Sequence, residues 1–293
     1  MDFEEKGEKA REQFLCLLNY KMQNINNLKV IVLNISNSCY VKCKYCPNGH
    51  NIHHEHLFLE DKKIITKLCD YMEEIDYHNE LSITGFGEPI TNYLCMDICR
   101  YIKKRMENRI KYKFITSGID FDGFNKDKIK ELVDLFGNDV VELTVHNQEF
   151  YFNQESYYNI LDFHMDGVKI RNHDTNNSNN TLKANNRGGT LYVPKNKRCR
   201  ACYYPFYEIC IDTNGDYICC AHNWLRTGYY NNIMDMSIKE HFCNYLDIYR
   251  EVLYKDNIKD ISPCKDCNTD GKLIGEEEMT EWVKLNKKGE TDK

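Results

Sequence analysis

The sequence is short of proline and glycine, and it has no long apolar run. Only 5 prolines and 15 glycines occur in 293 residues, and the mean hydropathy is -0.65. A helix that crosses a bilayer needs roughly 18 or more consecutive apolar residues, and the chain offers none. The opening residues, MDFEEKGEK, are acidic where a secretory signal is basic and then apolar. We therefore expect a cytoplasmic protein with no membrane partner.

The chain also has no excess of positive charge. It carries 39 basic and 45 acidic residues, a formal net charge of -6, and the two signs are spread along its length. A protein that binds nucleic acid neutralises the backbone phosphates with clustered Lys and Arg side chains. We therefore expect no nucleic-acid partner.

Cysteine, in contrast, is abundant. The chain has 15 cysteines, far more than packing requires. An odd count in a reducing compartment argues against a disulfide framework and favours ligation of a soft metal.

Strand-like and helix-like segments alternate over the first two thirds of the chain. The strand-like runs are 28–36, 81–85, 112–117, 140–145 and 167–171, and the helix-compatible stretches between them are 60–76, 91–107, 125–136 and 154–163. Such alternation gives parallel strands joined by right-handed crossovers, with functional loops at the carboxyl ends of the strands. The sequence predicts an α/β fold: an open, partial TIM-like β/α barrel of about five parallel strands.

Four regions are predicted along the chain. They are an N-terminal helical extension over 1–27 with a helix at 4–22, the partial barrel over 28–190, a small domain over 191–284 and a polar tail over 285–293. The polar, Asn-rich stretch 173–189 marks the end of the barrel. Two apolar runs that flank Asn214-Gly215 predict a β-hairpin in the small domain.

Three cysteines lie on the loop after the first predicted strand. Cys39, Cys43 and Cys46 fall within eight residues. Iron-sulfur clusters bind cysteine thiolates, and three ligands for four irons leave one iron open to a small molecule. A site that includes zinc is the alternative for this triad.

Polar residues also end the second and third predicted strands. Gly85-Phe86-Gly87-Glu88-Pro89 ends one, where glycines let the backbone approach a ligand and Glu88 offers an anion to an ammonium group. Thr116-Ser117-Gly118 ends the other and suits a ribose contact.

The CxxxCxxC spacing, with Tyr45 before the last cysteine, resembles the signature of the radical S-adenosylmethionine (SAM) superfamily. The Gly-Phe-Gly-Glu-Pro segment resembles the Gly-Gly-Glu-Pro motif of the same superfamily, with Phe86 in place of one glycine. The resemblance implies a 4Fe-4S cluster on the three cysteines, with SAM chelated to the open iron. It further implies cofactor contacts, which would come from Phe86, Gly87, Glu88, Ser117 and His146.

A second set of cysteines lies near the C-terminal end. Its predicted ligands are Cys202, Cys220, Cys264 and Cys267. The Gly-x4-Cys and Cys-x-x-Cys spacings resemble the twitch domain, the shorter variant of the SPASM domain, which implies a second, auxiliary 4Fe-4S cluster. Cys199 or Cys219 could replace its neighbour as a ligand, and a structural zinc site stays open as an alternative.

Further stretches resemble the twitch-type dehydrogenases that oxidise 2-deoxy-scyllo-inosamine. They are Thr144-Val145-His146, His173-Asp174 and Asn186-Arg187-Gly188-Gly189. The resemblance implies that a 5'-deoxyadenosyl radical takes hydrogen from a carbinol carbon of a sugar or cyclitol. A ketone then forms, the auxiliary cluster accepts an electron, and Arg187 faces the reacting alcohol. Because an arginine is always protonated, electrostatic stabilisation suits it better than the role of a base.

Two other functions remain open at this point. One is radical modification of a ribosomally made peptide, although the chain offers no room for a winged-helix leader-binding module before residue 28. The other is a non-catalytic zinc-binding module. The enzyme hypotheses imply a flavodoxin or ferredoxin as the reductant, and the first of them implies a small-molecule substrate.

Overall fold

The computed structural model describes residues 23–50, 57–172, 186–191, 201–227, 231–254, 261–269, 271 and 273–287. The helix predicted over 4–22, the pair His173-Asp174 and Cys199 lie outside the described residues. So does most of the predicted polar tail.

Seven strands form one sheet in the described part of the chain, in the order β7-β6-β3-β2-β1-β8-β9. The strands are β1 (Val30–Leu33), β2 (Glu80–Ile83), β3 (Lys111–Thr116), β6 (Val141–Val145), β7 (Val168–Asn172), β8 (Glu208–Ile211) and β9 (Tyr217–Ile218). Every neighbouring pair is parallel except β8 and β9. The open partial barrel is therefore confirmed, and its first five strands fall on the five predicted runs.

The sheet contains one more parallel strand than the sequence predicts. The predicted hairpin is present as β8 and β9, but β8 also pairs in parallel with β1, with Val30 opposite Glu208 and Leu33 opposite Ile211. The edge of β1 would otherwise carry unpaired backbone groups next to buried side chains, and β8 satisfies them. The C-terminal cysteine region is thus hydrogen-bonded directly into the barrel sheet.

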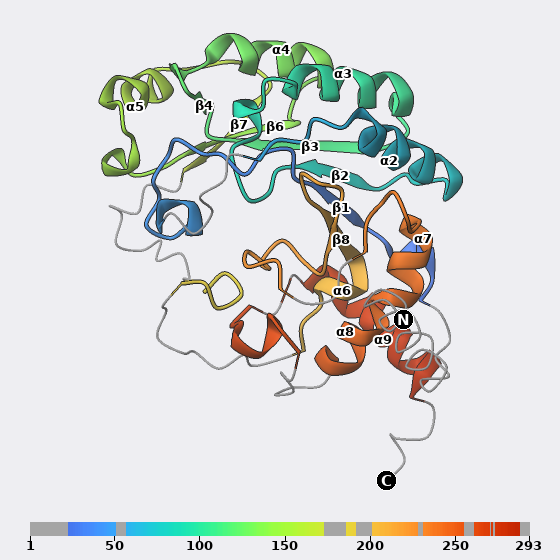
Figure 1. Ribbon diagram of the computed structural model, residues 1–293. Coiled ribbons are helices and arrows are strands. Elements are labelled where there is room, and N and C mark those ends of the chain that lie inside the picture. The colour runs from blue at the N-terminus through green and yellow to red at the C-terminus, as the bar shows by residue number, and fades with distance from the viewer. Residues whose placement is uncertain are drawn as a thin grey trace, which may run out of the picture.

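Four helices follow successive strands and lie together on one side of the sheet (Figure 1). They are α2 (Lys62–Glu74), α3 (Cys95–Met106), α4 (Lys126–Phe136) and α5 (Gln154–Leu161). Polar N-caps begin three of them: Asp61 accepts from the Lys63 N–H, Asn125 from Lys128 and Asn153 from Glu155. Their apolar stripes are buried against the sheet, and Cys69, Cys95 and Cys99 are packed there as small hydrophobic side chains.

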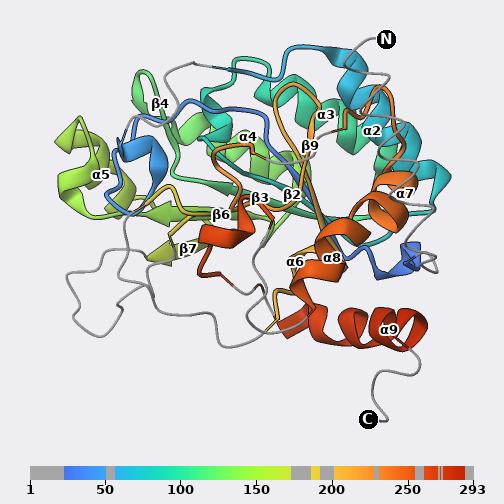
Figure 2. The same cartoon turned by 60° about the horizontal axis from the view of Figure 1, so that its bottom comes forward.

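The C-terminal helices gather beside β8, as Figure 2 shows from a second direction. They are α6 (Tyr204–Tyr207), α7 (Ile238–Glu240), α8 (Asp247–Leu253) and α9 (Glu276–Asn286). Asp247 joins two of them, because its Oδ1 accepts from Arg250 Nη1 at 2.8 Å and from Trp282 Nε1 at 2.9 Å.

Short elements complete the described chain. They are the hairpin β4 (Ile119–Asp120) and β5 (Gly123–Phe124), the 3-10 turns η1 (Ile25–Asn27), η2 (Pro47–His50), η3 (Pro89–Thr91), η4 (Gln148–Phe150), η6 (Cys264–Asp266) and η7 (Leu273–Gly275), and the π-helical turn η5 (His241–Tyr245). None of the helices in the described ranges is both long and apolar enough to cross a bilayer.

Candidate functional site

The loop after β1 carries the first three cysteines and folds back tightly on itself. The Cys46 N–H donates to the Cys43 carbonyl at 3.0 Å, and the Gly49 N–H donates to the Cys46 carbonyl at 2.9 Å. A Cβ on Gly49 would lie 2.1 Å from the Cys43 carbonyl oxygen, so a larger residue would force this turn open. These contacts therefore hold the cysteine loop in a tight turn.

Burial is the main influence on these thiols. It raises the pKa of Cys43 to about 12 and raises the pKa values of Cys39 and Cys46 as well. The nearby sulfur atoms add to the effect at Cys39 and Cys43, because neighbouring thiolates repel one another. One buried and two partly buried thiols that would repel each other as anions are a donor set that suits a positively charged group of irons.

A cavity of about 270 Å³ opens beside this loop. All nine residues that the sequence predicts for the first site line it: Cys39, Cys43, Cys46, Phe86, Gly87, Glu88, Ser117, His146 and Arg187. They come from the loop after β1, the ends of β2, β3 and β6, and the turn at 186–189. The carboxyl ends of parallel strands meet at one edge of a sheet, which explains how such distant segments converge.

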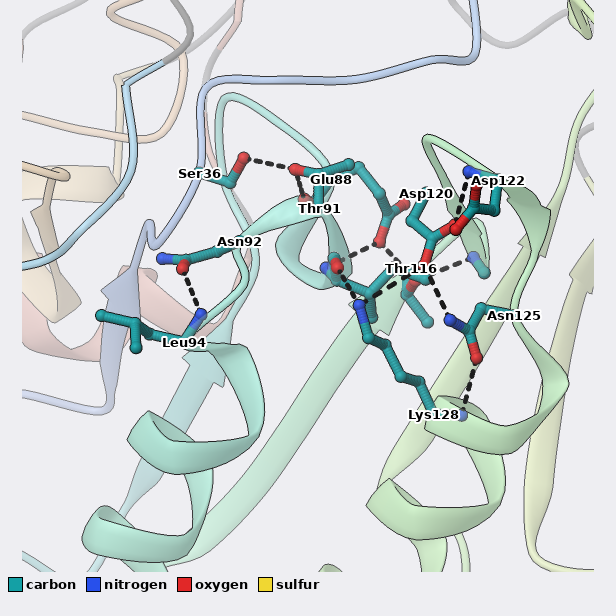
Figure 3. Close-up of polar contacts among 12 residues, drawn as sticks. Ser36, Glu88, Thr91, Asn92, Leu94, Thr116, Asp120, Asp122, Asn125 and Lys128 are labelled. Carbon is teal, nitrogen blue, oxygen red and sulfur yellow. Dashed lines mark hydrogen bonds and ion pairs between the residues drawn. The ribbon is translucent and has the colours of Figure 1, made fainter.

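Glu88 is buried in the wall of the cavity, and its carboxylate points toward the end of β3 (Figure 3). Oε1 accepts from the Thr116 hydroxyl, and Oε2 accepts from the Ser117 N–H at 2.6 Å and from the Ser117 hydroxyl at 2.5 Å. Burial raises the pKa of Glu88, and these hydrogen bonds oppose the rise. Glu88 thus fixes the Ser117 loop as well as lining the cavity.

Phe86 takes part in the cavity through its backbone. Its N–H donates to Asn34 Oδ1 at 3.1 Å, and its carbonyl accepts from Asn48 Nδ2 at 2.5 Å. The ring packs edge-on against Trp224, with a centroid separation of 5.0 Å. A phenylalanine is accommodated where the superfamily motif has glycine because its side chain fills a separate apolar cluster.

His146 directly follows β6 and contacts the cysteine loop. Its Nδ1 is hydrogen-bonded to the Tyr45 hydroxyl, and its backbone N–H donates to the Tyr151 hydroxyl at 3.0 Å. Burial, together with the neighbouring Cys43, raises the pKa of Tyr45 above its ordinary value. Tyr45 is therefore a neutral hydroxyl that ties the cysteine loop to β6.

The Asn-Arg-Gly-Gly turn is clamped between two segments of the second cysteine region. The Asn186 N–H donates to Asn268 Oδ1 at 2.8 Å, and the Asn268 N–H donates back to Asn186 Oδ1 at 3.1 Å. A Cβ on Gly188 would lie 2.4 Å from the His222 carbonyl oxygen. Arg187 itself has a φ of 48°, a conformation that is uncommon for a residue other than glycine.

Arg187 lies between the two cysteine sites. It lines the cavity of Cys39, Cys43 and Cys46, and its charge helps to lower the pKa of His222, which lines the second site. Burial is the larger cause of that shift, which brings the pKa of His222 to about 3.

The second set of cysteines surrounds a much smaller space of about 20 Å³. Cys202, Cys220, Cys264 and Cys267 all line it, together with Cys219, Tyr204 and His222. Cys219 is hydrogen-bonded to Cys220 and Cys264, and these bonds together with burial raise its pKa. The choice between Cys219 and Cys220 as a ligand therefore stays open.

Both donor sets fit iron-sulfur clusters. Each consists of soft sulfur atoms gathered at the wall of a cavity. Among the described residues, no three His, Cys, Asp or Glu side chains converge on a single ion position. A cubane cluster needs no such convergence, because each cysteine binds a different iron.

Sequence analysis missed further residues of the first cavity, among them Trp224 and Arg171. Arg171 comes from the carboxyl-terminal half of β7, so its position near a strand end was a usable signal. Trp224 depends on the fold of the 220–224 turn, which no local pattern predicts.

Comparisons with known proteins give a family and a fold. A family model described as a 4Fe-4S single cluster domain matches residues 29–187. The solved structure of BtrN in complex with AdoMet and 2-DOIA is 19% identical, with a TM-score of 0.65, and the match covers 83% of this chain and 93% of that one. BtrN in an open conformation is 15% identical, with a TM-score of 0.58 and coverages of 83% and 92%.

A third solved structure is Streptococcus suis SuiB bound to the precursor peptide SuiA. It is 13% identical, with a TM-score of 0.50, and the match covers 94% of this chain and 78% of SuiB. A search of curated proteins finds no match.

Proposed function

The chain belongs to the 4Fe-4S single cluster domain family and has the open β/α barrel predicted from the alternation of its strands and helices. From this and from its resemblance to radical SAM enzymes, we propose that it is a radical SAM oxidoreductase. Its cofactors are a 4Fe-4S cluster on Cys39, Cys43 and Cys46, SAM, and an auxiliary 4Fe-4S cluster beside Arg187. The reaction is the two-electron oxidation of a sugar or cyclitol alcohol to a ketone.

One observation carries this proposal: a single cavity is lined by all three cysteines of the loop together with Glu88, Ser117, His146 and Arg187. When bound, the cluster and SAM supply one-electron cleavage of the sulfonium to a 5'-deoxyadenosyl radical, which takes a hydrogen atom from the substrate. The residues of this chain hold those groups in place and shield them from water.

The wall formed by Glu88 and Ser117 suits the methionyl and ribose parts of SAM. Glu88 supplies buried negative charge, which favours an ammonium group nearby. The Ser117 hydroxyl donates a hydrogen bond to Glu88, so its oxygen is left to accept a hydrogen bond. A ribose hydroxyl is a donor that matches this oxygen.

Arg187 suits the stabilisation of a developing negative charge on the substrate oxygen. A guanidinium stays protonated, and the turn that carries Arg187 is held in place by the two hydrogen bonds between Asn186 and Asn268. Because Arg187 also lies next to the second cysteine site, an electron that leaves the substrate radical has an acceptor close by. Resemblance to BtrN in complex with 2-DOIA supports a small-molecule substrate.

Peptide modification is the second candidate function. The likeness to SuiB bound to its precursor peptide supports it, over most of this chain. The two candidates share the first cluster and SAM and differ in the substrate and in the outcome, which for a peptide would be cross-linking or epimerisation.

Anaerobic reconstitution with iron and sulfide tests the shared chemistry. With dithionite and SAM, we expect the protein to form 5'-deoxyadenosine, and we expect the Cys43→Ala variant to form none. Cys69→Ala is the matched control, because Cys69 is also buried but belongs to α2 and does not line the cavity. A colourless protein that holds only zinc and leaves SAM intact would eliminate both enzyme functions and leave the zinc-binding module.

A further inference from the structure

His222 is buried beside the second set of cysteines. It lies two positions after Cys220, and it lines the small cavity that the four predicted cysteine ligands of this site surround. The Trp224 N–H donates to its carbonyl at 3.0 Å, and the Asn223 N–H donates to the Cys220 carbonyl at 3.1 Å, so the turn that carries His222 is fixed. Because the ring is buried, its two nitrogen atoms depend on neighbours inside the protein for hydrogen bonds.

One ring nitrogen of His222 has a partner, and the other has none. The Tyr204 hydroxyl lies 2.9 Å from Nε2, and the Tyr204 ring is itself stacked on Tyr207 with a centroid separation of 5.8 Å. Nδ1 is buried as well, but it has no hydrogen-bond partner among the described residues. Buried polar atoms are nearly always hydrogen-bonded, so an unpartnered one at the wall of a site indicates contact with a group that the site binds.

The Tyr204 hydroxyl determines which nitrogen of a neutral His222 ring carries the proton. Burial raises the pKa of Tyr204, so the hydroxyl keeps its proton. If the hydroxyl donates to Nε2, the ring proton lies on Nδ1, and only this N–H lacks a partner in the described part of the chain. The opposite arrangement leaves both the hydroxyl proton and the Nδ1 lone pair without one, which costs more. A protonated ring would carry Nδ1–H too, so the donor at the cavity wall does not depend on the charge of His222.

We propose that Nδ1–H of His222 donates a hydrogen bond to a sulfur atom of the auxiliary cluster and raises the reduction potential of that cluster. The inference rests on the proposed function, because it needs an iron-sulfur cluster at the four cysteines. Sulfur atoms carry more negative charge in a reduced cluster than in an oxidised one, so a hydrogen-bond donor stabilises the reduced form more. His222 thereby makes the auxiliary cluster a stronger acceptor for the one electron that leaves the substrate radical.

Two substitutions of similar shape test the donor. His222→Asn and His222→Leu both lose the contact between Nε2 and Tyr204, but the asparagine amide keeps an N–H near the position of Nδ1, whereas leucine has none. His78→Asn, at an exposed histidine, is the control. The reconstituted holoenzyme is titrated electrochemically and followed by electron paramagnetic resonance, and the iron content of each variant is measured. Addition of SAM identifies the first cluster, because SAM changes only the signal of that cluster.

We expect His222→Leu to keep the wild-type iron content and to have an auxiliary cluster that is about tenfold harder to reduce. For a one-electron couple, this factor corresponds to a midpoint potential that is about 59 mV more negative. His222→Asn should bring the potential back toward the wild-type value, and His78→Asn should leave it unchanged. The midpoint potential of the first cluster should be the same in all of these proteins.

Three results would overturn the hydrogen bond to the cluster. An auxiliary potential in His222→Leu equal to that of the wild type would show that the ring donates nothing to the cluster. Equal shifts in His222→Leu and His222→Asn would show that packing, and not the N–H, sets the potential. Loss of iron from both variants would show that His222 holds the cluster in place. A wild-type protein that binds zinc at the second site and gives no auxiliary signal would instead count against the proposed function.

Discussion

At the scale of single residues, burial decides which side chains can change their charge. His222 is 8% exposed, it is hydrogen-bonded through Nε2 to the Tyr204 hydroxyl at 2.9 Å, and its pKa is lowered to about 3. In the unfolded chain a histidine titrates near 6.5, so the unfolded state binds more protons than the folded state between these two pH values. His222 therefore favours folding above pH 6.5, and that contribution is lost as the pH falls toward 3.

The prediction at His222 concerns acid stability. Between pH 6.5 and 5.5, the free energy of unfolding of the wild type should fall by about 1 kcal/mol more than that of His222→Gln. Urea unfolding at each pH measures the difference. His78→Gln, at a side chain that is 57% exposed, serves as the control and should keep the wild-type slope. Identical slopes for wild type and His222→Gln would show that His222 is not buried as a neutral ring.

The sequence predicts the residues whose spacing is local and misses those that depend on distant packing. Cys39, Cys43, Cys46 and Glu88 belong to short patterns at strand ends, so they could be placed together before the fold was known. Trp224 contacts Phe86 across 138 positions of sequence, and Tyr151 reaches the cysteine loop through a single bridge. Contacts of this kind arise only when the chain has folded.

At the scale of elements, the turn at 186–189 joins the two cysteine regions. Gly188 has a φ of 66° and packs against the His222 carbonyl, so a methyl group there would meet both backbone strain and a direct clash. Gly137, which ends α4, has a φ of 91° but no neighbour within 4 Å of its missing Cβ. Alanine at Gly137 would therefore cause backbone strain alone, whereas alanine at Gly188 would also displace the neighbouring chain.

Gly188→Ala is expected to displace Arg187 and lower substrate oxidation by tenfold or more, on the order of the loss for one misplaced electrostatic contact. Gly137→Ala should cost about 1 kcal/mol of stability and leave the oxidation rate unchanged. Thermal unfolding and product formation measure the two effects. Wild-type oxidation by Gly188→Ala would mean that the turn does not position Arg187 for the reaction.

Most elements of the barrel could be predicted because each satisfies a local rule. Apolar runs predict β1, β2, β3, β6 and β7 of the sheet, and polar caps such as Asp61 and Asn125 mark helix starts. The place of β8 beside β1 could not be predicted, because nothing in residues 208–211 identifies β1 as their partner. β8 pairs with β1 because, once the barrel has folded, β1 lies at its open edge with unpaired backbone groups.

At the scale of the whole molecule, the two cysteine sites are separate cavities on one continuous sheet. Adjacent residues of the same two turns line them, Arg187 and Trp224 on the first cavity and Gly188, Cys220 and His222 on the second, but no described cysteine lines both. A variant that removes one site should therefore lose only the chemistry of that site, even though β8 pairs with β1 and joins the C-terminal region to the barrel.

Loss of the auxiliary site tests that separation. Cys264→Ala combined with Cys267→Ala should abolish oxidation of the substrate, because the electron has no acceptor, and should leave dithionite-driven formation of 5'-deoxyadenosine within about twofold of the wild type. Chromatographic assay of both products measures the outcome. Equal loss of both activities would mean that the two sites do not act independently.

The central claim is that Cys39, Cys43 and Cys46 hold a 4Fe-4S cluster with one iron open to SAM. Electron paramagnetic resonance of the reduced Cys264→Ala/Cys267→Ala variant, recorded with and without SAM, tests it most directly, because only the first cluster contributes. The account predicts a 4Fe-4S signal that changes shape when SAM is added and that is absent when Cys43→Ala is introduced as well. A signal that SAM leaves unchanged, or one that survives without Cys43, would contradict it.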